Sequence, residues 1–240
     1  MKHYIKQRFR ESLLNEEPSD VDKIINLLKS GDESNIELAY ALGEGQGINV
    51  DELVKSIYGI LLTKSKGNTI KNKLLNLSNL KGLDLSNNKL TTLTKGITNL
   101  TNLKYLNLEY NKLTSLEGIE NLTNLIWLRS SNNRLTTLTK GITNLKGLDL
   151  RNNKLTNLKG IENLTNLKVL YLDNNKLTTL PKGITNLTNL KELYLSNNKL
   201  TSLEGIEKFT NLERLSLHNN PISDEEIERI KKLLPDTKIY

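Results

Sequence analysis

Ten residues of this 240-residue sequence have the side chains and the spacing of a protein-binding surface. They stand at positions that vary inside a motif whose other positions repeat almost unchanged, so the fold does not dictate their identity. Aromatic residues and arginine predominate among them, and such residues bury large areas at interfaces with little loss of conformational freedom. The predicted partner-binding residues are Tyr105, Asn107, Trp127, Arg129, Asp149, Arg151, Tyr171, Asp173, Tyr194 and His218.

Two other interpretations stay open. Exposed aromatic residues also favour strands by packing against the next strand, so the protein could be a purely structural spacer. A basic residue also follows a repeated asparagine in six copies of the motif. Such a row could attract nucleic acid or anionic glycans without specific recognition, or it could serve solubility. The row consists of Lys89, Lys112, Arg134, Lys154, Lys176 and Lys199.

No residues in the sequence form a recognisable catalytic, cofactor or metal site. The chain has no cysteine, and its two histidines, His3 and His218, lie near opposite ends. The glycine cluster from Gly43 to Gly47 lacks the preceding strand and the Gly-Lys-Ser/Thr ending of a phosphate loop, so it predicts a helix end and a turn. We therefore predict that the protein is not an enzyme and binds no cofactor.

The variable positions belong to a repeat of 20 to 23 residues. Its first copy runs from Leu80 to Leu90 and fits the pattern L-x-x-L-x-L-x-x-N-x-L. In a strand with Leu83 and Leu85 inward, the residues before, between and after them point outward. The repeated asparagine is expected to bind backbone groups where the strand ends. Six more copies start at Leu103, Leu125, Leu145, Leu167, Leu190 and Leu212.

The third copy departs from the others in two respects. Ser130 stands where Leu85 and Leu108 stand in the earlier copies, which predicts a locally underfilled core. The copy is also three residues shorter, because a Thr-Asn-Leu step is missing before Lys146. We expect this deletion to tighten the loop that returns to the next strand.

The repeat resembles that of leucine-rich repeat proteins over about residues 80–222. Its Leu-Thr-Asn-Leu-Lys sequences and its spacing of about 22 residues are similar to the internalin-type repeats of bacterial surface proteins, and similar short coils occur in intracellular regulators of protein phosphatase 1. The resemblance implies an α/β leucine-rich repeat solenoid, a horseshoe whose parallel sheet lines the concave face and commonly grips another protein. We therefore predict a monomeric, non-catalytic scaffold that binds a protein partner through that face.

Four regions are expected along the chain. Residues 1–66 lack the repeat and predict a helical N-terminal cap domain. Residues 67–79 predict a junction or a degenerate first coil, residues 80–222 seven repeats, and residues 223–240 a C-terminal cap with one helix. Caps are expected because a solenoid otherwise exposes its first and last core layers.

Capping residues indicate where the helices begin. Ser19 and Asn49 are each followed three residues later by an acidic residue, as at a helix N-terminus, and a further helix is expected between them. Ser223 opens a capping box before an apolar face, which predicts the C-terminal helix. An additional helix is expected near Tyr4–Leu14.

Charge and hydropathy place further bounds on the protein. The formal net charge is +7, and the excess of basic residues lies in the repeats. The sequence contains no run of about 18 apolar residues, so it does not predict a transmembrane helix. The first residues lack the apolar segment of a signal peptide, so we expect a soluble protein of the cytoplasm.

Overall fold

The computed structural model describes residues 19–138 and 141–240. The helix expected near Tyr4–Leu14 lies outside these residues. Among the helices that the structure describes, none is both long and apolar enough to cross a membrane.

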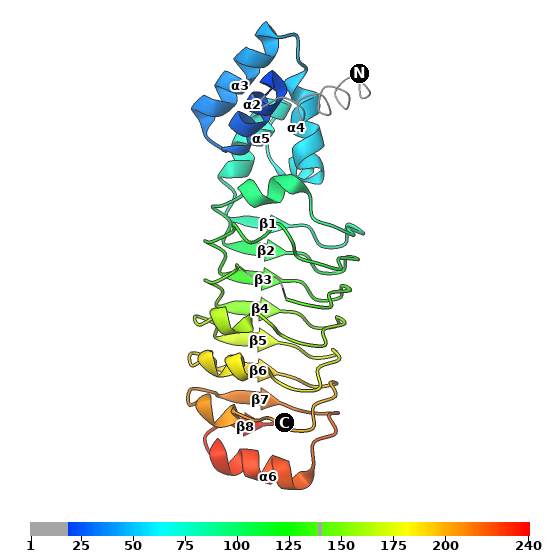
Figure 1. Ribbon diagram of the computed structural model, residues 1–240, viewed down its shortest axis with the longest axis vertical. Helices are drawn as coiled ribbons and strands as arrows, with labels where there is room; N and C mark the ends of the chain where they lie inside the picture. The colour runs from blue at the N-terminus through cyan, green and yellow to red at the C-terminus, as the bar shows by residue number, and fades with distance from the viewer. Residues whose placement is uncertain (1–18, 139–140) are drawn as a thin grey trace. The chain divides into compact units, whose positions relative to one another are not determined.

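The described residues fall into two compact units, which are drawn in Figure 1. The helical unit contains the described residues up to Leu80 and the loop Thr94–Leu100. The repeat unit contains Lys81–Leu93 and the described residues from Thr101 onward. A loop of the first repeat is therefore part of the helical unit, a boundary that the repeat pattern alone does not reveal.

Helices of the helical unit begin where the sequence supplies a capping side chain. The Ser19 hydroxyl accepts the backbone N–H of Asp22, and the Asp22 carboxylate accepts the backbone N–H of Ser19. Asn49 accepts the backbone N–H of Glu52 in the same way. Both predicted N-caps are confirmed. The elements are α2 (Asp20–Lys29), α3 (Glu33–Gly45), α4 (Val50–Tyr58), the 3-10 turn η2 (Gly59–Lys64) and α5 (Ile70–Ser78).

The residues expected as a junction or degenerate first coil contain helix α5. Leu74 and Leu77 are buried in this helix. Thr69 caps the helix, since its hydroxyl accepts the backbone N–H of Asn72. Local capping explains why these residues are helical although their leucines recur at a spacing of three.

Two hydrogen bonds attach the loop of the first repeat to the helices within the helical unit. The Thr94 hydroxyl donates to the Ile57 carbonyl at 2.7 Å. The Asn99 side chain donates to the Tyr58 hydroxyl at 3.2 Å, and burial raises the pKa of that hydroxyl to about 12. These contacts hold the 3-10 turn η3 (Lys95–Asn99) against α4.

The repeat unit contains one parallel sheet whose strands follow each other in chain order. Seven strands come from the seven predicted repeats, and β8, at the C-terminal end, pairs with β7 beyond the repeats. Strand β8 was not predicted, and it covers the edge that β7 would otherwise leave unpaired. The strands are β1 (Gly82–Asp84), β2 (Tyr105–Asn107), β3 (Trp127–Arg129), β4 (Gly147–Asp149), β5 (Val169–Tyr171), β6 (Glu192–Tyr194), β7 (Arg214–Ser216) and β8 (Lys238–Ile239).

Leucines fill the interior of the repeat unit in rows. The central leucine of every strand from β1 to β7 is buried, as are the leucines that close the second to sixth repeats, Leu113, Leu135, Leu155, Leu177 and Leu200. Ser130 interrupts one row: it is fully buried, and its hydroxyl has no hydrogen-bond partner among the described residues. A hydroxyl buried in this way costs roughly 1–3 kcal/mol. Three return segments carry the 3-10 turns η4 (Ile161–Asn163), η5 (Lys182–Asn186) and η6 (Ile206–Lys208).

The repeated asparagines connect each coil to the one before it. The Asn153 side-chain carbonyl accepts the backbone N–H of Leu135 at 3.0 Å. Its amide donates to the carbonyl of Ser130 at 2.9 Å and to that of Leu150 at 3.0 Å. This confirms the prediction that the repeated asparagine binds backbone groups where the strand ends. The same arrangement occurs at Asn111, Asn133, Asn175, Asn198 and Asn220.

The C-terminal helix α6 (Asp224–Leu233) is tied to the last coils by its own cap. Ser223 accepts the backbone N–H of Glu226, as predicted. The Glu226 carboxylate also accepts the backbone N–H of Leu203 at 3.0 Å and pairs with Arg229. The cap therefore satisfies a backbone donor of the solenoid as well as closing its end.

Replacing one ladder asparagine tests how much these bonds contribute. Asn153→Ala leaves several buried backbone groups without partners, so we expect it to lower the free energy of unfolding by about 2–4 kcal/mol. The adjacent Asn152 is exposed and has a left-handed backbone conformation that glycine also adopts, so Asn152→Gly should change stability by less than about 1 kcal/mol. Urea denaturation measures both, and equal losses would contradict the ladder role.

Candidate protein-binding face

Outward side chains of the strands form one surface, which we call the strand face. Neighbouring strands pair residue for residue, so the first residues of the strands form one row and the third residues another. Adjacent members of a row are about 4.8 Å apart along the sheet. The first row is Gly82, Tyr105, Trp127, Gly147, Val169, Glu192 and Arg214, and the second is Asp84, Asn107, Arg129, Asp149, Tyr171, Tyr194 and Ser216.

At the centre of the strand face, Arg151 is held by two of the predicted residues. Its guanidinium donates to the Asp149 carboxylate at 2.6 Å and lies 4.7 Å from the centre of the Tyr171 ring. The hydrogen bond to Asp149 raises the pKa of Arg151, and burial raises that of Tyr171. The structure corrects the expected exposure of Asp149, which is only 3% exposed. The carboxylate therefore positions Arg151.

The same chain of contacts continues toward β7. Tyr171 stacks on Tyr194 with 4.7 Å between ring centroids and 17° between ring planes. The Tyr194 hydroxyl donates to the Glu192 carboxylate at 2.9 Å, and Arg214 pairs with the same carboxylate. Burial and the bond to Glu192 together raise the pKa of Tyr194 to about 12. We call Asp149, Arg151, Tyr171, Glu192, Tyr194 and Arg214 the paired cluster.

Two other predicted residues lie just past the strands. Asp173 is partly buried, which raises its pKa, although the backbone N–H of Ser196 donates to it at 3.0 Å and acts in the opposite direction. His218 is exposed. Within residues 19–138 and 141–240, no three histidine or acidic side chains come together as a metal site would require.

Trp127 lies over the neighbouring strand. A Cβ atom added to Gly147 would be 2.3 Å from the indole Cε3, so the ring occupies the space that a side chain at residue 147 would need. The indole N–H is buried and has no hydrogen-bond partner among the described residues. Trp127 is thus half-buried, with its orientation set by the absence of a side chain on Gly147.

A depression of about 530 Å³ opens between β1 and β3. Its walls are mostly apolar. Gly82 contributes no side chain next to Tyr105, which leaves the space open there. The depression is lined by Gly82, Leu83, Asp84, Tyr105, Leu106, Asn107, Trp127 and Arg129. We call it the open depression. Four of the ten predicted residues line it, and they differ from the paired cluster in their exposure and pairing.

Tyr105 and Arg129 are the most accessible predicted residues of the open depression. The Tyr105 side chain is 55% exposed. Arg129 is exposed and forms no ion pair with any residue that the structure describes, unlike Arg151 and Arg214. This end of the strand face therefore offers an aromatic ring and an unpaired guanidinium to solvent.

Comparison with known proteins identifies the fold family. The family model for leucine-rich repeats in two copies matches residues 78–124, 143–186 and 188–229, more than half of the chain. The chain is a leucine-rich repeat protein. Residues 125–142, which include Trp127 and Arg129, lie between two of the matched segments. The fold supports a role as a protein-interaction scaffold in general, and proteins with these repeats are typically non-enzymatic.

Solved structures similar to this leucine-rich repeat protein come from two bacterial genera. A leucine-rich repeat protein of Leptospira interrogans is 39% identical over 71% of this chain, with a TM-score of 0.57. Internalin C2 of Listeria monocytogenes is 26% identical over 79% of the chain (TM-score 0.53), and the internalin InlF is 25% identical over 68% (TM-score 0.51). The predicted resemblance to internalins is confirmed.

The relatives differ in length. The chain spans 50% of the Leptospira protein, 92% of internalin C2 and 55% of InlF. No curated protein matches the chain.

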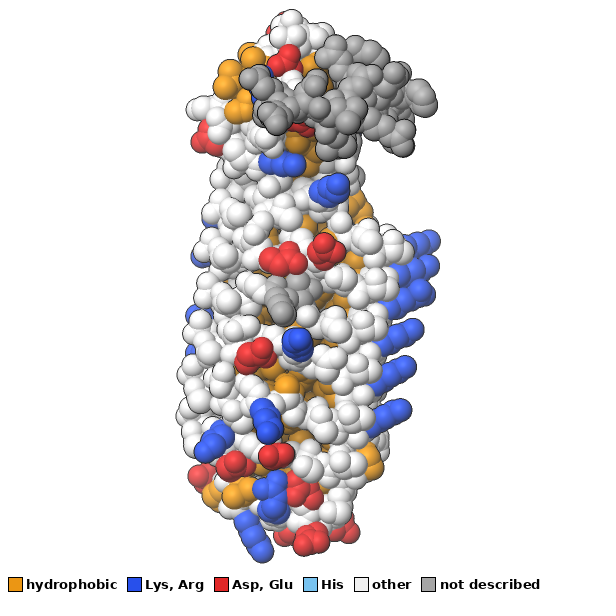
Figure 2. Space-filling view, in the orientation of Figure 1, with side chains coloured by type: hydrophobic (Ala, Val, Ile, Leu, Met, Phe, Trp, Pro, Cys, Tyr) orange, Lys and Arg blue, Asp and Glu red, His pale blue; other side chains and the backbone are white. Residues whose placement is uncertain are grey.

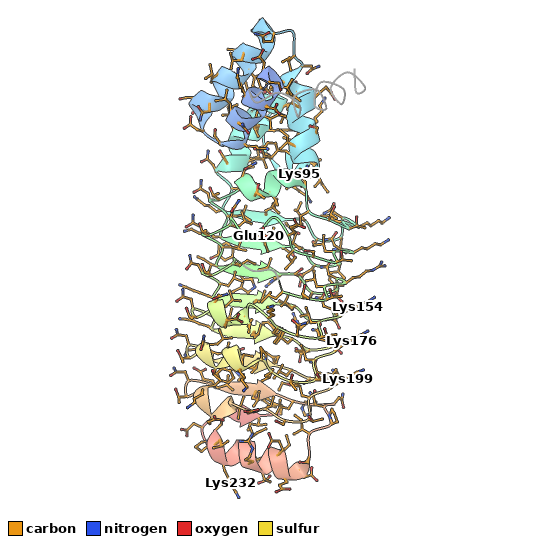
Figure 3. All side chains as sticks on the ribbon, in the orientation of Figure 1. Lys95, Glu120, Lys154, Lys176, Lys199 and Lys232 are labelled. Carbon is orange, nitrogen blue, oxygen red and sulfur yellow. The ribbon has the colours of Figure 1, made fainter. Side chains whose placement is uncertain are left out.

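The predicted row of basic residues runs along one edge of the repeat unit. Figure 2 shows basic side chains projecting side by side from this edge, and Figure 3 labels three of them, Lys154, Lys176 and Lys199. All six residues of the row are exposed, and none forms an ion pair with another described residue. The row follows from the repeat itself, because each member comes directly after a ladder asparagine.

The glycines that shape the strand face were not among the residues predicted from the sequence. Gly82 and Gly147 stand in the row that holds Tyr105 and Trp127, and their missing side chains create the depression and the seat of the indole. Writing the repeats one above another places Trp127 beside Gly147 and would have revealed this. Tyr110 was also missed: it is 58% exposed and has a positive φ of 54° where the other repeats have asparagine.

Alanine substitutions at two glycines, Gly147 and Gly82, test the position of the Trp127 ring. Gly147→Ala places a methyl group where the indole lies, so we expect a loss of about 1–3 kcal/mol in the free energy of unfolding and stronger acrylamide quenching of Trp127 fluorescence. At Gly82 the nearest atom to an added Cβ is the Tyr105 Cβ at 4.0 Å, so Gly82→Ala should change neither quantity. Unchanged quenching in Gly147→Ala would refute the placement of the ring.

Proposed function

We propose that this leucine-rich repeat protein is a non-catalytic scaffold that binds a partner protein through the strand face, with the open depression at the centre of the contact. The observation that carries the proposal is the combination of Tyr105, 55% exposed, with Trp127 and Arg129 around one mostly apolar depression. Arg129 has no ion-pair partner among the described residues. Aromatic residues and arginine beside a desolvated pocket are the usual composition of an interface hot spot.

The free energy that a partner would gain by burying apolar surface at the open depression supports the proposal. Covering the exposed part of Tyr105 would remove roughly 100 Å² from water, which contributes about 2–3 kcal/mol. The paired cluster offers less, because its charged groups already have partners and a new contact would have to replace existing ones. We therefore assign the main contact to β1–β3 and a supporting role to β4–β7.

The row of basic residues gives the second candidate function, binding of an anionic polymer. In its favour, six exposed cations stand at the spacing of adjacent strands, and none of them pairs with an acidic residue that the structure describes. Against it, the row arises wherever the repeat occurs, and exposed lysines also keep a solenoid soluble. The two functions differ in salt dependence, since binding through phosphate or sulfate contacts weakens steeply as salt rises.

Binding of cellular proteins to the immobilised chain tests the proposal. We expect a partner that is retained by the wild type and by Tyr240→Ala, and that Tyr105→Ala weakens by about 30-fold, the effect of a hot-spot residue. Tyr240 is a suitable control because it is 51% exposed and directly follows β8, at the opposite end of the sheet from β1. Titration calorimetry on the purified partner measures the affinities.

Washing the immobilised chain at high salt distinguishes the two candidate functions. Retention at about 0.5 M salt, where charges are screened beyond about 4–5 Å, is the expected result. Proteins that leave the column at that salt, together with equal retention by Tyr105→Ala, would contradict the proposal and favour the basic row.

A further inference from the structure

The open depression has an apolar part and a charged end. In the first row Gly82 is next to Tyr105, and Trp127 follows on the far side of Tyr105; all three line the depression. The space above Gly82 is therefore bordered by the Tyr105 side chain. Its volume of about 530 Å³ is within the range of pockets that enclose a ligand group, roughly 300–1,000 Å³. An aromatic side chain fits such a space, because its face or edge can pack against the Tyr105 ring.

Arg129 gives the depression its electrostatic preference. Three arginines lie on or beside the strand face, and two of them are neutralised: Arg151 by Asp149 and Arg214 by Glu192. Arg129 alone among these has no carboxylate partner in the part of the chain that the structure describes. An exposed guanidinium beside an apolar space favours a carboxylate, which it can bind through two parallel hydrogen bonds.

The acidic residue of the depression is separated from Arg129 by a strand. Asp84 is in the same row as Arg129, with Asn107 between them, so the two backbone positions are about 10 Å apart at the normal strand spacing. A guest carboxylate at Arg129 therefore lies away from Asp84. The positive net charge of the chain acts in the same direction.

We propose that the open depression is an anchor site for a partner segment in which an aromatic residue is next to an aspartate or glutamate. The ring enters the space above Gly82 and packs against Tyr105, and the neighbouring carboxylate pairs with Arg129. This inference rests on the proposed function, and it adds the chemistry of the partner. A second copy of this chain is the competing occupant, because Glu109 and the exposed Tyr110 form such a pair on its own surface.

Trp127 is the only tryptophan, so its indole N–H gives a single assignable NMR signal at the proposed anchor site. The probes are three capped dipeptides: acetyl-Phe-Asp-amide, acetyl-Phe-Asn-amide and acetyl-Phe-Lys-amide. We expect a saturable shift of the indole signal with the first, about fivefold weaker binding of the second, and weaker binding still of the third, as for an exposed ion pair.

Three variants assign the effect to the two parts of the site. Gly82→Leu places an apolar side chain in the space, where an added Cβ meets only the Tyr105 Cβ at 4.0 Å, and should remove binding of all three peptides. Arg129→Gln should bind the Asp and Asn peptides equally. Lys176→Gln removes one positive charge from the basic row and should keep the fivefold preference. Unchanged amide signals of the buried leucines show that each variant is folded.

The proposal is overturned if no dipeptide shifts the indole signal of the wild type, or if Arg129→Gln keeps the preference for aspartate. Concentration-dependent dimers in sedimentation that Tyr110→Ala abolishes would assign the depression to a second copy instead. A partner lost in Tyr105→Ala without any dipeptide preference would refute this inference and leave the proposed function standing. A preference for the aspartate dipeptide, with no partner protein retained by the immobilised chain, would support this inference and refute the proposed function.

Discussion

The repeat unit depends on a buried asparagine that occurs once in every coil. Where a strand ends, the chain turns, and its backbone groups leave the sheet. The asparagine accepts a backbone N–H of the preceding coil and donates to carbonyls of both coils, so these groups stay paired although they are buried. Leucines can then fill the rest of the interior. Because neighbouring coils are fixed residue for residue, the outward side chains also form straight rows.

This arrangement leaves the strand face free to vary, and its two ends differ. Toward β4–β7, acids, arginines and tyrosines pair with each other, and Asp149 is buried as a result. Toward β1–β3, Gly82 leaves a space beside Tyr105, and Arg129 has no acidic partner among the described residues. A surface already exposed in its binding conformation loses little freedom when a partner arrives. Binding at the open end, as proposed, would therefore replace fewer existing contacts than binding at the paired cluster.

Much of the fold could be predicted because the repeat encodes it locally. The leucine spacing, the ladder asparagines and the capping residues Ser19, Asn49 and Ser223 each act within a few residues. Strand β8 carries no repeat signal and was not predicted. The helix at residues 70–78 was not predicted either, because its leucines resemble those of a degenerate coil. The site was harder to predict, because pairing on the strand face depends on residues about 22 positions apart. Trp127 could be assigned to the outward face from its own repeat, but not its seat on Gly147.

The division of the strand face can be measured in the free protein by hydroxyl-radical footprinting, since the oxidation rate of a tyrosine follows the exposure of its ring. We expect Tyr105 to be oxidised several-fold faster than Tyr171 and Tyr194, whose rings are stacked on each other. Equal rates at the three tyrosines would mean that the paired cluster does not form in solution. The strand face would then be one uniform surface, without an open end prepared for a partner.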